Sequence, residues 1–214
     1  MNQCRYVLAV RDFHRKGGHV VNVEPTIPPP GVTVQRQRLI FEEMGELASA
    51  FHERDIIEFA DGLADFVYVV VGTAVAYGVG LAECWADTVE KRYAPIYAPK
   101  ICSYDLAMQQ FSRMSKAISR LFMGMAHANL PSIQEFISEL MERAFEFAWL
   151  CGIPLAAVID EVHSSNMSKN LVPTNGIDKY SLPTKLVKGE GYHPPDVARI
   201  LGVQPSVSAA EAGK

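Results

Sequence analysis

The fold is decided by the stretch IFEEMGELASAFHERDIIEFADGLADFVYVVVGTAVAYG, which spans residues 40–78. Its apolar residues recur at steps of three and four, the period of an amphipathic α-helix. This period predicts one helix from Thr33 to about His52. A second helix is predicted to begin after Asp55, whose carboxylate can cap the first turn, and to end at Gly78. Because the intervening turn is short, we expect the two helices to pack antiparallel.

Helical periods also surround this hairpin on both sides. VLAVRDFHRK, residues 7–16, predicts a short helix that stops at the following glycine pair, and the proline-rich PTIPPPG predicts an extended linker. Further helices are expected over residues 80–94, Ser103–Ala128, Pro131–Leu150 and Ala156–Ser165, with a short one after Asp196. No segment sustains a period of two, so no sheet is expected. The predicted fold class is all-α, a helical bundle.

The second half of the helical region is similar to the first. AYGVGLAECW (residues 76–85) and LCGIPLAAVI (residues 150–159) share a glycine, an aliphatic residue and a leucine at matching steps. Phe41-x-x-Met44 likewise matches Phe111-x-x-Met114. These matches favour an ancient duplication of a helical hairpin. The two repeats would cover residues 33–96 and 103–170.

Length and composition predict one compact domain. The chain has 214 residues, of which 49% are hydrophobic and 21% charged, which excludes a disordered protein. Twenty basic and 24 acidic residues give a net charge of -4, without the basic surplus that binds a nucleic acid polymer. We expect a domain over residues 1–200 and a flexible tail over residues 201–214.

The same composition bears on location. The most apolar run, Phe66–Val79, is shorter than the about 18 residues of a membrane span, and no signal peptide is recognisable at the N-terminus. The four cysteines form no CxxC pair, which disfavours a zinc site and a disulfide framework. We therefore expect a cytoplasmic protein without a membrane partner. The methionine-rich helix is expected to pack in the core or between repeats; its methionines are Met108, Met114, Met123 and Met125.

Two groups of carboxylates lie on the hairpin helices. They are Glu42, Glu43 and Glu46 on the first helix and Glu58, Asp61 and Asp65 on the second. Each group follows one helical face, since three or four residues correspond to about one turn. Carboxylates that face each other in a low-dielectric groove require a compensating cation. Oxygen ligands without His or Cys are typical of Mg²⁺ or Mn²⁺. The alternative is that these acids form a solvated face.

This pattern resembles the all-α nucleoside triphosphate pyrophosphohydrolases, the superfamily of MazG-like proteins, dimeric dUTPases and phosphoribosyl-ATP pyrophosphohydrolases. Their signature is ExxE on one helix and ExxD on the next. EMGE matches the first part, and DGLADFVY resembles the second. Gly62 stands where the family has its glutamate, so Asp61 would supply the missing carboxylate. The metal ligands that the resemblance implies are Glu43, Glu46, Asp61 and Asp65, with Glu58 in reserve.

Further segments extend the resemblance. EVHSSNMSKN (residues 161–170) and KLVKGEGYHPPD (residues 185–196) resemble the closing motifs of a phosphoribosyl-ATP pyrophosphohydrolase-like branch, as does VRDFH near the N-terminus. Residues 86–130 match only through the suspected repeat. In the second repeat, Ser112, Arg113 and Lys116 stand at the positions of Glu42, Glu43 and Glu46. One half therefore resembles a catalytic hairpin and the other a degenerate partner.

The activity that the resemblance implies is hydrolysis between the α- and β-phosphates of a nucleotide, giving a monophosphate and pyrophosphate. This reaction needs neutralised phosphate charge and an aimed water molecule. Mg²⁺, or Mn²⁺, would serve the first need. Glu42 is the candidate that orients or deprotonates the water. The C-terminal substrate loop, residues 166–196, supplies the candidates for substrate binding; they are Asn166, Lys169, Lys188 and Tyr192.

Two other functions agree with the sequence. The substrate would in one case be phosphoribosyl-ATP or another non-standard nucleotide. In the other case the chain is a non-catalytic helical module that binds nucleotide or metal, which the degenerate second half and Gly62 favour. The expected partner of either enzyme is a nucleotide substrate. The methionine-rich and aromatic faces would also allow a homodimer.

Overall fold

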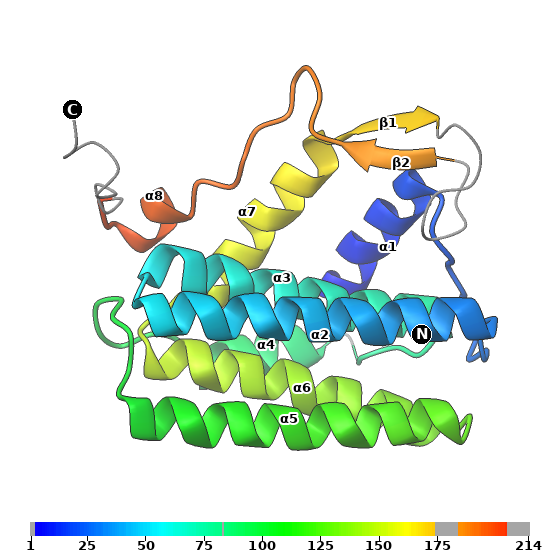
Figure 1. Ribbon diagram of the computed structural model, residues 1–214, viewed down its shortest axis with the longest axis horizontal. Coiled ribbons are helices and arrows are strands. Elements are labelled where there is room, and N and C mark those ends of the chain that lie inside the picture. The colour runs from blue at the N-terminus through cyan, green and yellow to red at the C-terminus, as the bar shows by residue number, and fades with distance from the viewer. Residues whose placement is uncertain (1–2, 83, 174–183, 205–214) are drawn as a thin grey trace.

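The computed structural model describes residues 3–82, 84–173 and 184–204, and its described part is almost entirely helical (Figure 1). The predicted all-α class is confirmed. The helices are α1 (Arg5–Gly17), α2 (Pro30–Glu53), α3 (Ile56–Tyr77), α4 (Cys84–Arg92), α5 (Tyr104–Ala126), α6 (Leu130–Leu150), α7 (Leu155–Ser168) and α8 (Val197–Leu201). Of the tail expected over residues 201–214, Leu201 is instead the buried last residue of α8, and residues 205–214 lie outside the described residues.

One small sheet corrects the expectation that there would be none. β1 (Asn170–Pro173) pairs antiparallel with β2 (Thr184–Val187), with Asn170 opposite Val187. Each strand has four residues, too few for an alternating pattern to be recognised in the sequence. β1 follows α7 directly and β2 contacts α1, so the pairing of the strands depends on tertiary packing.

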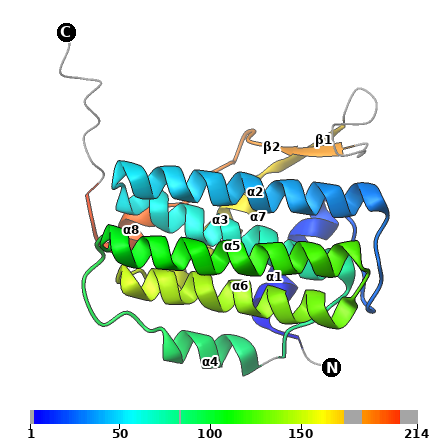
Figure 2. The same cartoon turned by 60° about the horizontal axis from the view of Figure 1, so that its bottom comes forward.

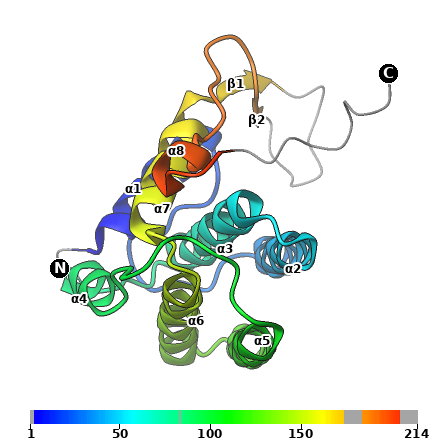
Figure 3. The ribbon, with the colours of Figure 1, turned by 90° about the vertical axis from the view of Figure 1, so that its left-hand side faces the viewer.

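Four helices form the central bundle. α2 packs on α3, α5 packs on α6, and α3 packs on α6, so that two antiparallel hairpins lie against each other (Figures 2 and 3). Four phenylalanines, one from each helix, join the hairpins in the core through ring centroids that lie 5.0–6.2 Å apart. They are Phe51, Phe59, Phe111 and Phe147.

α3 is the core helix of the molecule. Among the described residues it is the one helix long and apolar enough to cross a membrane, with a mean hydropathy of 1.5 over an 18-residue window. However, 78% of that window is buried inside the bundle, because α1, α2, α6 and α7 all pack against it. Its apolar surface is therefore accounted for by protein contacts.

The ends of α3 are those that the sequence predicted. The Asp55 carboxylate accepts hydrogen bonds from the backbone N–H groups of Ile57 (2.9 Å) and Glu58 (3.1 Å). At the other end, Gly78 adopts φ +63°, the left-handed conformation that caps a helix. α2 begins at Pro30, earlier than expected, because proline is well tolerated in the first turn of a helix.

The two glycine motifs that suggested a duplication form the same turn. Gly78 follows α3 with φ +63° and Gly152 follows α6 with φ +66°. The next residue bonds back to the helix in both cases, Val79 N to Ala74 O at 3.1 Å and Ile153 N to Ala148 O at 2.9 Å. The duplication itself stays a prediction, and this shared turn supports it.

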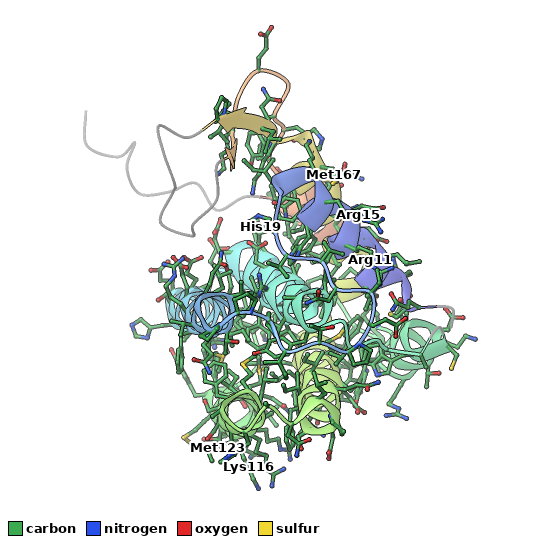
Figure 4. The ribbon with its side chains drawn as sticks, turned by 90° about the vertical axis from the view of Figure 1, so that its right-hand side faces the viewer. Arg11, Arg15, His19, Lys116, Met123 and Met167 are labelled. Atoms are coloured by element: carbon green, nitrogen blue, oxygen red, sulfur yellow. The ribbon has the colours of Figure 1, made fainter. Side chains whose placement is uncertain are left out.

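The methionine-rich helix α5 divides its methionines between two faces. Met114 and Met125 are buried, as expected, but Met108 and Met123 are exposed. Figure 4 shows Met123 on the outer side of the bundle. The expectation of core packing is wrong for these two, because the helices that pack on α5 leave both side chains exposed.

A second layer covers one side of the α2–α3 hairpin. α1 and α7 pack on α3 and on each other, and α8 packs on both α3 and α7 (Figure 3). The α5–α6 hairpin lies on the other side. The space between the hairpin and this covering layer is where the carboxylates of α2 and α3 meet the C-terminal residues.

Gly45 is expected to be a site of easy stabilisation. It lies inside α2, and a Cβ added there would meet nothing within 4 Å. Gly45→Ala should raise the free energy of unfolding by about 0.5–1 kcal/mol, because alanine loses less backbone entropy in a helix. Urea denaturation of the metal-free protein measures this. Gly78→Ala should have the opposite sign, since its Cβ would lie 2.0 Å from Glu24 O. Equal effects of the two changes would contradict this account.

Candidate functional site

Two adjoining cavities lie between the α2–α3 hairpin and the covering layer. The first, here the aromatic cavity, has a volume of about 370 Å³ and includes Phe13, Arg36, Glu43 and Tyr68 in its walls. The second, here the lysine cavity, has a volume of about 320 Å³. Its polar walls include Glu58, Asp61, Ser165, Lys188 and Tyr192. Three residues line both cavities, namely Asp65, Asn166 and Lys169.

The carboxylates of α2 and α3 act on one another across these cavities. Burial, and then the charges of Asp65 and Glu46, raise the pKa of Glu43 to about 8. Burial and the charge of Asp61 raise the pKa of Asp65 to about 7, while Lys169 opposes the rise. Burial and the charge of Glu58 raise the pKa of Asp61 to about 6. The raised pKa values mean that the surrounding protein groups do not balance the negative charges of these carboxylates.

The donor set fits a hard divalent cation. The Asp61 Oδ1 atom is buried and has no hydrogen-bond partner among the described residues, so it is available to coordinate a cation. The neighbouring acids supply further oxygens, the ligands that Mg²⁺ prefers. In the described part of the chain, no three His, Cys, Asp or Glu side chains already converge as a metal cluster. Binding would therefore have to draw the carboxylates together.

Not all the predicted acids line the cavities. Glu43, Glu58, Asp61 and Asp65 do. Glu46 is exposed on α2, although its charge raises the pKa values of Glu43 and Asp65. Glu42 is exposed and forms an ion pair with Arg38 at 3.3 Å. One residue is about 100° of helix rotation, which turns Glu42 away from Glu43.

Gly62, where the family signature has glutamate, faces α2. A Cβ at this position would lie 3.5 Å from the Leu47 Cα atom, an ordinary contact between two closely packed helices. The adjacent Asp61 lies in the wall of the lysine cavity. The acid next to the glycine is thus the one that reaches the cavity, as the sequence suggested.

The four predicted substrate-binding residues are brought together in the lysine cavity. The Lys169 ammonium donates to Asn166 Oδ1 at 2.6 Å. The Lys188 Nζ atom lies 5.3 Å from the ring centroid of Tyr192, which is a cation–π contact. Both lysines line the same cavity as Asp61 and Asp65, and both lower the pKa values of these acids.

Serine hydroxyls fix the loop that carries Lys188 and Tyr192. Ser165 Oγ donates to His193 O at 2.8 Å, and the His193 N–H donates to Ser168 Oγ at 3.1 Å. Asn170 Nδ2 donates to Glu190 O at 3.0 Å. The SSNMSKN segment therefore anchors the KGEGYHPP segment.

Arg36 is a site residue that sequence reasoning missed. Its guanidinium is buried in the wall of the aromatic cavity and donates to Val69 O and, at 3.3 Å, to Thr73 Oγ1. Burial lowers its pKa to about 10. A Cβ on Gly72 would lie 2.5 Å from Arg36 Nη2, so the glycine makes room for the guanidinium. The available signal was a charged residue four positions before Ile40, on the buried face of α2.

Rings form another part of the walls of the aromatic cavity. Phe13 and Tyr68 meet edge to face with centroids 5.4 Å apart, and the Tyr68 hydroxyl lies 2.9 Å from His163 Nδ1. His14 is buried beside Arg36, and both burial and the arginine charge lower its pKa to about 3. A neutral His14 and an aromatic lining suit a flat, uncharged ring.

The chemistry of the site divides into three parts. Carboxylates from two helices can hold a cation, lysines from the C-terminal segments can bind an anion, and the aromatic cavity can accept a ring. The lining residues shared by the cavities connect these parts. A phosphorylated ligand with an attached base has this combination of groups.

Comparison with known proteins agrees with this chemistry. Residues 10–92 match the family model of phosphoribosyl-ATP pyrophosphohydrolase, which confirms the resemblance to the all-α nucleoside triphosphate pyrophosphohydrolases. An uncharacterised protein of Acanthamoeba polyphaga mimivirus is 28% identical over 174 residues, covering 75% of this chain and 69% of that protein. No solved structure matches. The family match contains every carboxylate discussed above, whereas Lys169 and Lys188 lie outside it.

Proposed function

We propose that this chain, which matches the phosphoribosyl-ATP pyrophosphohydrolase family over residues 10–92, hydrolyses a nucleoside or deoxynucleoside triphosphate to the monophosphate and pyrophosphate. The observation that carries the proposal is the lysine cavity, where buried acids of α3 face the ammonium groups of Lys169 and Lys188. Acids alone would hold a metal and lysines alone an anion. Together they suit a metal-bound polyphosphate.

Glu43, Glu46, Asp61 and Asp65 would hold the metal, Mg²⁺ or Mn²⁺. The raised pKa values of three of these acids and the unpaired Asp61 Oδ1 support the assignment. When bound, the metal neutralises phosphate charge and lowers the pKa of a water molecule. The family in general depends on divalent metals, and the identity of the ion here is part of the proposal.

The chain's own cations would bind the phosphates. Lys169 lies where the two cavities meet and reaches Asn166, so it can contact a phosphate beside the α3 acids. Lys188 would hold the outer phosphates, positioned by the ring of Tyr192. Glu42 would orient the attacking water only after its carboxylate leaves Arg38, since the two now form an ion pair at 3.3 Å.

The aromatic cavity would receive the base. Phe13 and Tyr68 offer ring edges and faces, and the Arg36 guanidinium can donate to an acceptor atom on the base. The Tyr192 ring, one of the candidates for substrate binding, lies in the lysine cavity beside Lys188. We therefore assign Tyr192 to the phosphate end of the substrate.

The direct test is pyrophosphate release from a panel of nucleoside and deoxynucleoside triphosphates with Mg²⁺. The proposal expects one molecule of pyrophosphate and one of monophosphate for each substrate consumed. Glu46→Ala should reduce the rate. The absence of turnover with every substrate, or a rate that Glu46→Ala leaves unchanged, would reject the proposal.

The family match favours a second candidate, phosphoribosyl-ATP or another non-standard nucleotide as substrate. This second candidate predicts turnover of that compound and almost no activity on dUTP and dCTP, and the same assay measures both. A non-catalytic module is distinguished by calorimetry, because it would bind nucleotide tightly without forming product.

Lys169→Met is expected to lower kcat/KM for the best triphosphate by about tenfold, because one charge-assisted contact to phosphate is lost. Methionine keeps most of the side-chain volume. Lys91→Met, on the exposed side of α4, is the matched control and should leave kcat/KM unchanged. Equal rates for Lys169→Met and the parent protein would remove Lys169 from the site.

A further inference from the structure

The α5–α6 hairpin carries a group of positive side chains, here the cationic cluster. Arg113, Lys116 and Arg120 project from α5 and Arg143 from α6, and together with Glu139 they line a cavity of about 360 Å³. Figure 4 shows Lys116 on the opposite side of the molecule from Met167, near the end of α7. The cationic cluster is therefore remote from the aromatic and lysine cavities.

The positive charge of this cluster is only partly compensated. Arg113 and Arg143 both pair with Glu146, the former at 3.1 Å. Arg120 lies 5.7 Å from the ring centroid of Phe136. In the part of the chain that the structure describes, neither Lys116 nor Arg120 forms an ion pair. Like charges three and four residues apart on one helix repel, so an anion would relieve the cluster.

The cluster occupies the place on its hairpin that the acids occupy on theirs. The Phe41 and Phe111 match puts Arg113 and Lys116 at the positions of Glu43 and Glu46. The shared glycine turns put Glu139 and Arg143 at the positions of Asp65 and Val69. The second hairpin therefore has a charged cavity like that of the first, but mostly of the opposite sign.

We propose that the cationic cluster binds a phosphoryl oligoanion, either inorganic pyrophosphate or the phosphate tail of a nucleotide. Guanidinium groups from two helices and an ammonium group converge there, the donor types that bind phosphate oxygens best. The four positive and two negative side chains leave an excess of positive charge, which repels metal ions. Glu139, Glu146 and the chain's net charge of -4 disfavour a nucleic acid polymer.

The test is calorimetric titration of the full chain with pyrophosphate in EDTA, so that neither metal nor turnover is involved. The background is Lys169→Met/Lys188→Met, which removes the two ammonium groups of the lysine cavity. Binding should persist in this background. Adding Lys116→Gln and Arg120→Gln should weaken it by about tenfold for each change, since each removes a charge-assisted contact.

Three controls make the result specific. Lys91→Gln removes an exposed charge on α4 and should leave the affinity unchanged. Arg120→Lys keeps the charge and should retain most of the binding. Thermal melts of all variants should coincide.

Titration with a nucleoside triphosphate and its monophosphate distinguishes the two candidate ligands. Equal affinity for pyrophosphate and triphosphate would show that the cluster recognises the phosphate chain. Tighter binding of the triphosphate would show that it recognises the nucleotide.

Several outcomes would overturn the proposal. One is pyrophosphate affinity that Lys116→Gln and Arg120→Gln leave unchanged. Another is binding that disappears at about 0.15 M salt, where exposed charges are largely screened. Binding of an oligonucleotide but not of pyrophosphate would likewise reject it. Because the titration needs no catalysis, a failure of the proposed hydrolysis leaves this test intact.

Discussion

Asp65→Asn is expected to lower Mg²⁺-dependent pyrophosphate release by about a hundredfold or more and, at the same time, to stabilise the metal-free protein. Asp65 is the acid that lines both cavities, so its carboxylate can reach a metal from either. Its pKa is raised to about 7 because burial and the charge of Asp61 disfavour ionisation. A neutral amide of the same shape removes that penalty together with the ligand.

Two measurements on the same samples check this. Steady-state pyrophosphate release gives the loss of activity. Urea denaturation in EDTA near pH 8 should show a gain on the order of 1–2 kcal/mol. Glu135→Gln, on the exposed side of α6, is the control and should change neither quantity by much. Full activity in Asp65→Asn would exclude the residue as a ligand, and a loss of stability would show that its charge is compensated.

The metal-free protein should also lose stability as the pH rises from about 6.5 to about 8.5. In the folded state Glu43 stays largely protonated through most of this range and Asp65 only below about pH 7, because their pKa values are raised to about 8 and about 7. In the unfolded chain both acids are already ionised. The folded state therefore binds more protons, and stability present at lower pH is lost as the pH rises through these folded pKa values.

The expected loss is on the order of 2 kcal/mol across this window, after allowance for the partial exposure of Glu43. Burial and the charges of Asp65, Glu46, Glu42 and Asp61 raise the pKa of Glu43. His14 does not affect stability within this pH window. Its pKa of about 3 in the folded state makes stability rise with pH below about pH 6.5, which is the opposite slope.

Chemical denaturation at several pH values measures this slope. Excess Mg²⁺ should flatten the slope and raise the stability, because the ion binds the ionised carboxylates of the folded state only. Glu43→Gln should flatten it without metal. A slope that neither Mg²⁺ nor Glu43→Gln alters would mean that other groups titrate in this range.

Short-range signals in the sequence determine much of this fold. Asp55 and Gly78 bound α3 through their own side chain and backbone conformation, and the apolar period of α2 fixes which face packs. The β1–β2 pair was missed because its strands are short and are joined across a long connection. The exposure of Met108 and Met123 depends on how the two hairpins pack, which periodicity does not specify.

The parts of the site that depend on local sequence spacing were predictable, and the parts that depend on tertiary packing were not. Acids at helical spacing, such as Asp61 and Asp65, had to share a face, and they do share one cavity. Their position opposite Lys169 and Lys188 depends on the packing of α7 over α3, which only the motif resemblance anticipated. Arg36 escaped notice because its role depends on the space that Gly72 leaves on another helix.

The joining of both hairpins in one polypeptide has a consequence for how this molecule can evolve. A symmetric dimer of a single hairpin must carry every substitution twice, once on each side. Here α3 meets α6 within one chain, so each hairpin can change alone and dilution cannot separate them. That freedom allows one molecule to present a negative groove on one hairpin and a positive one on the other.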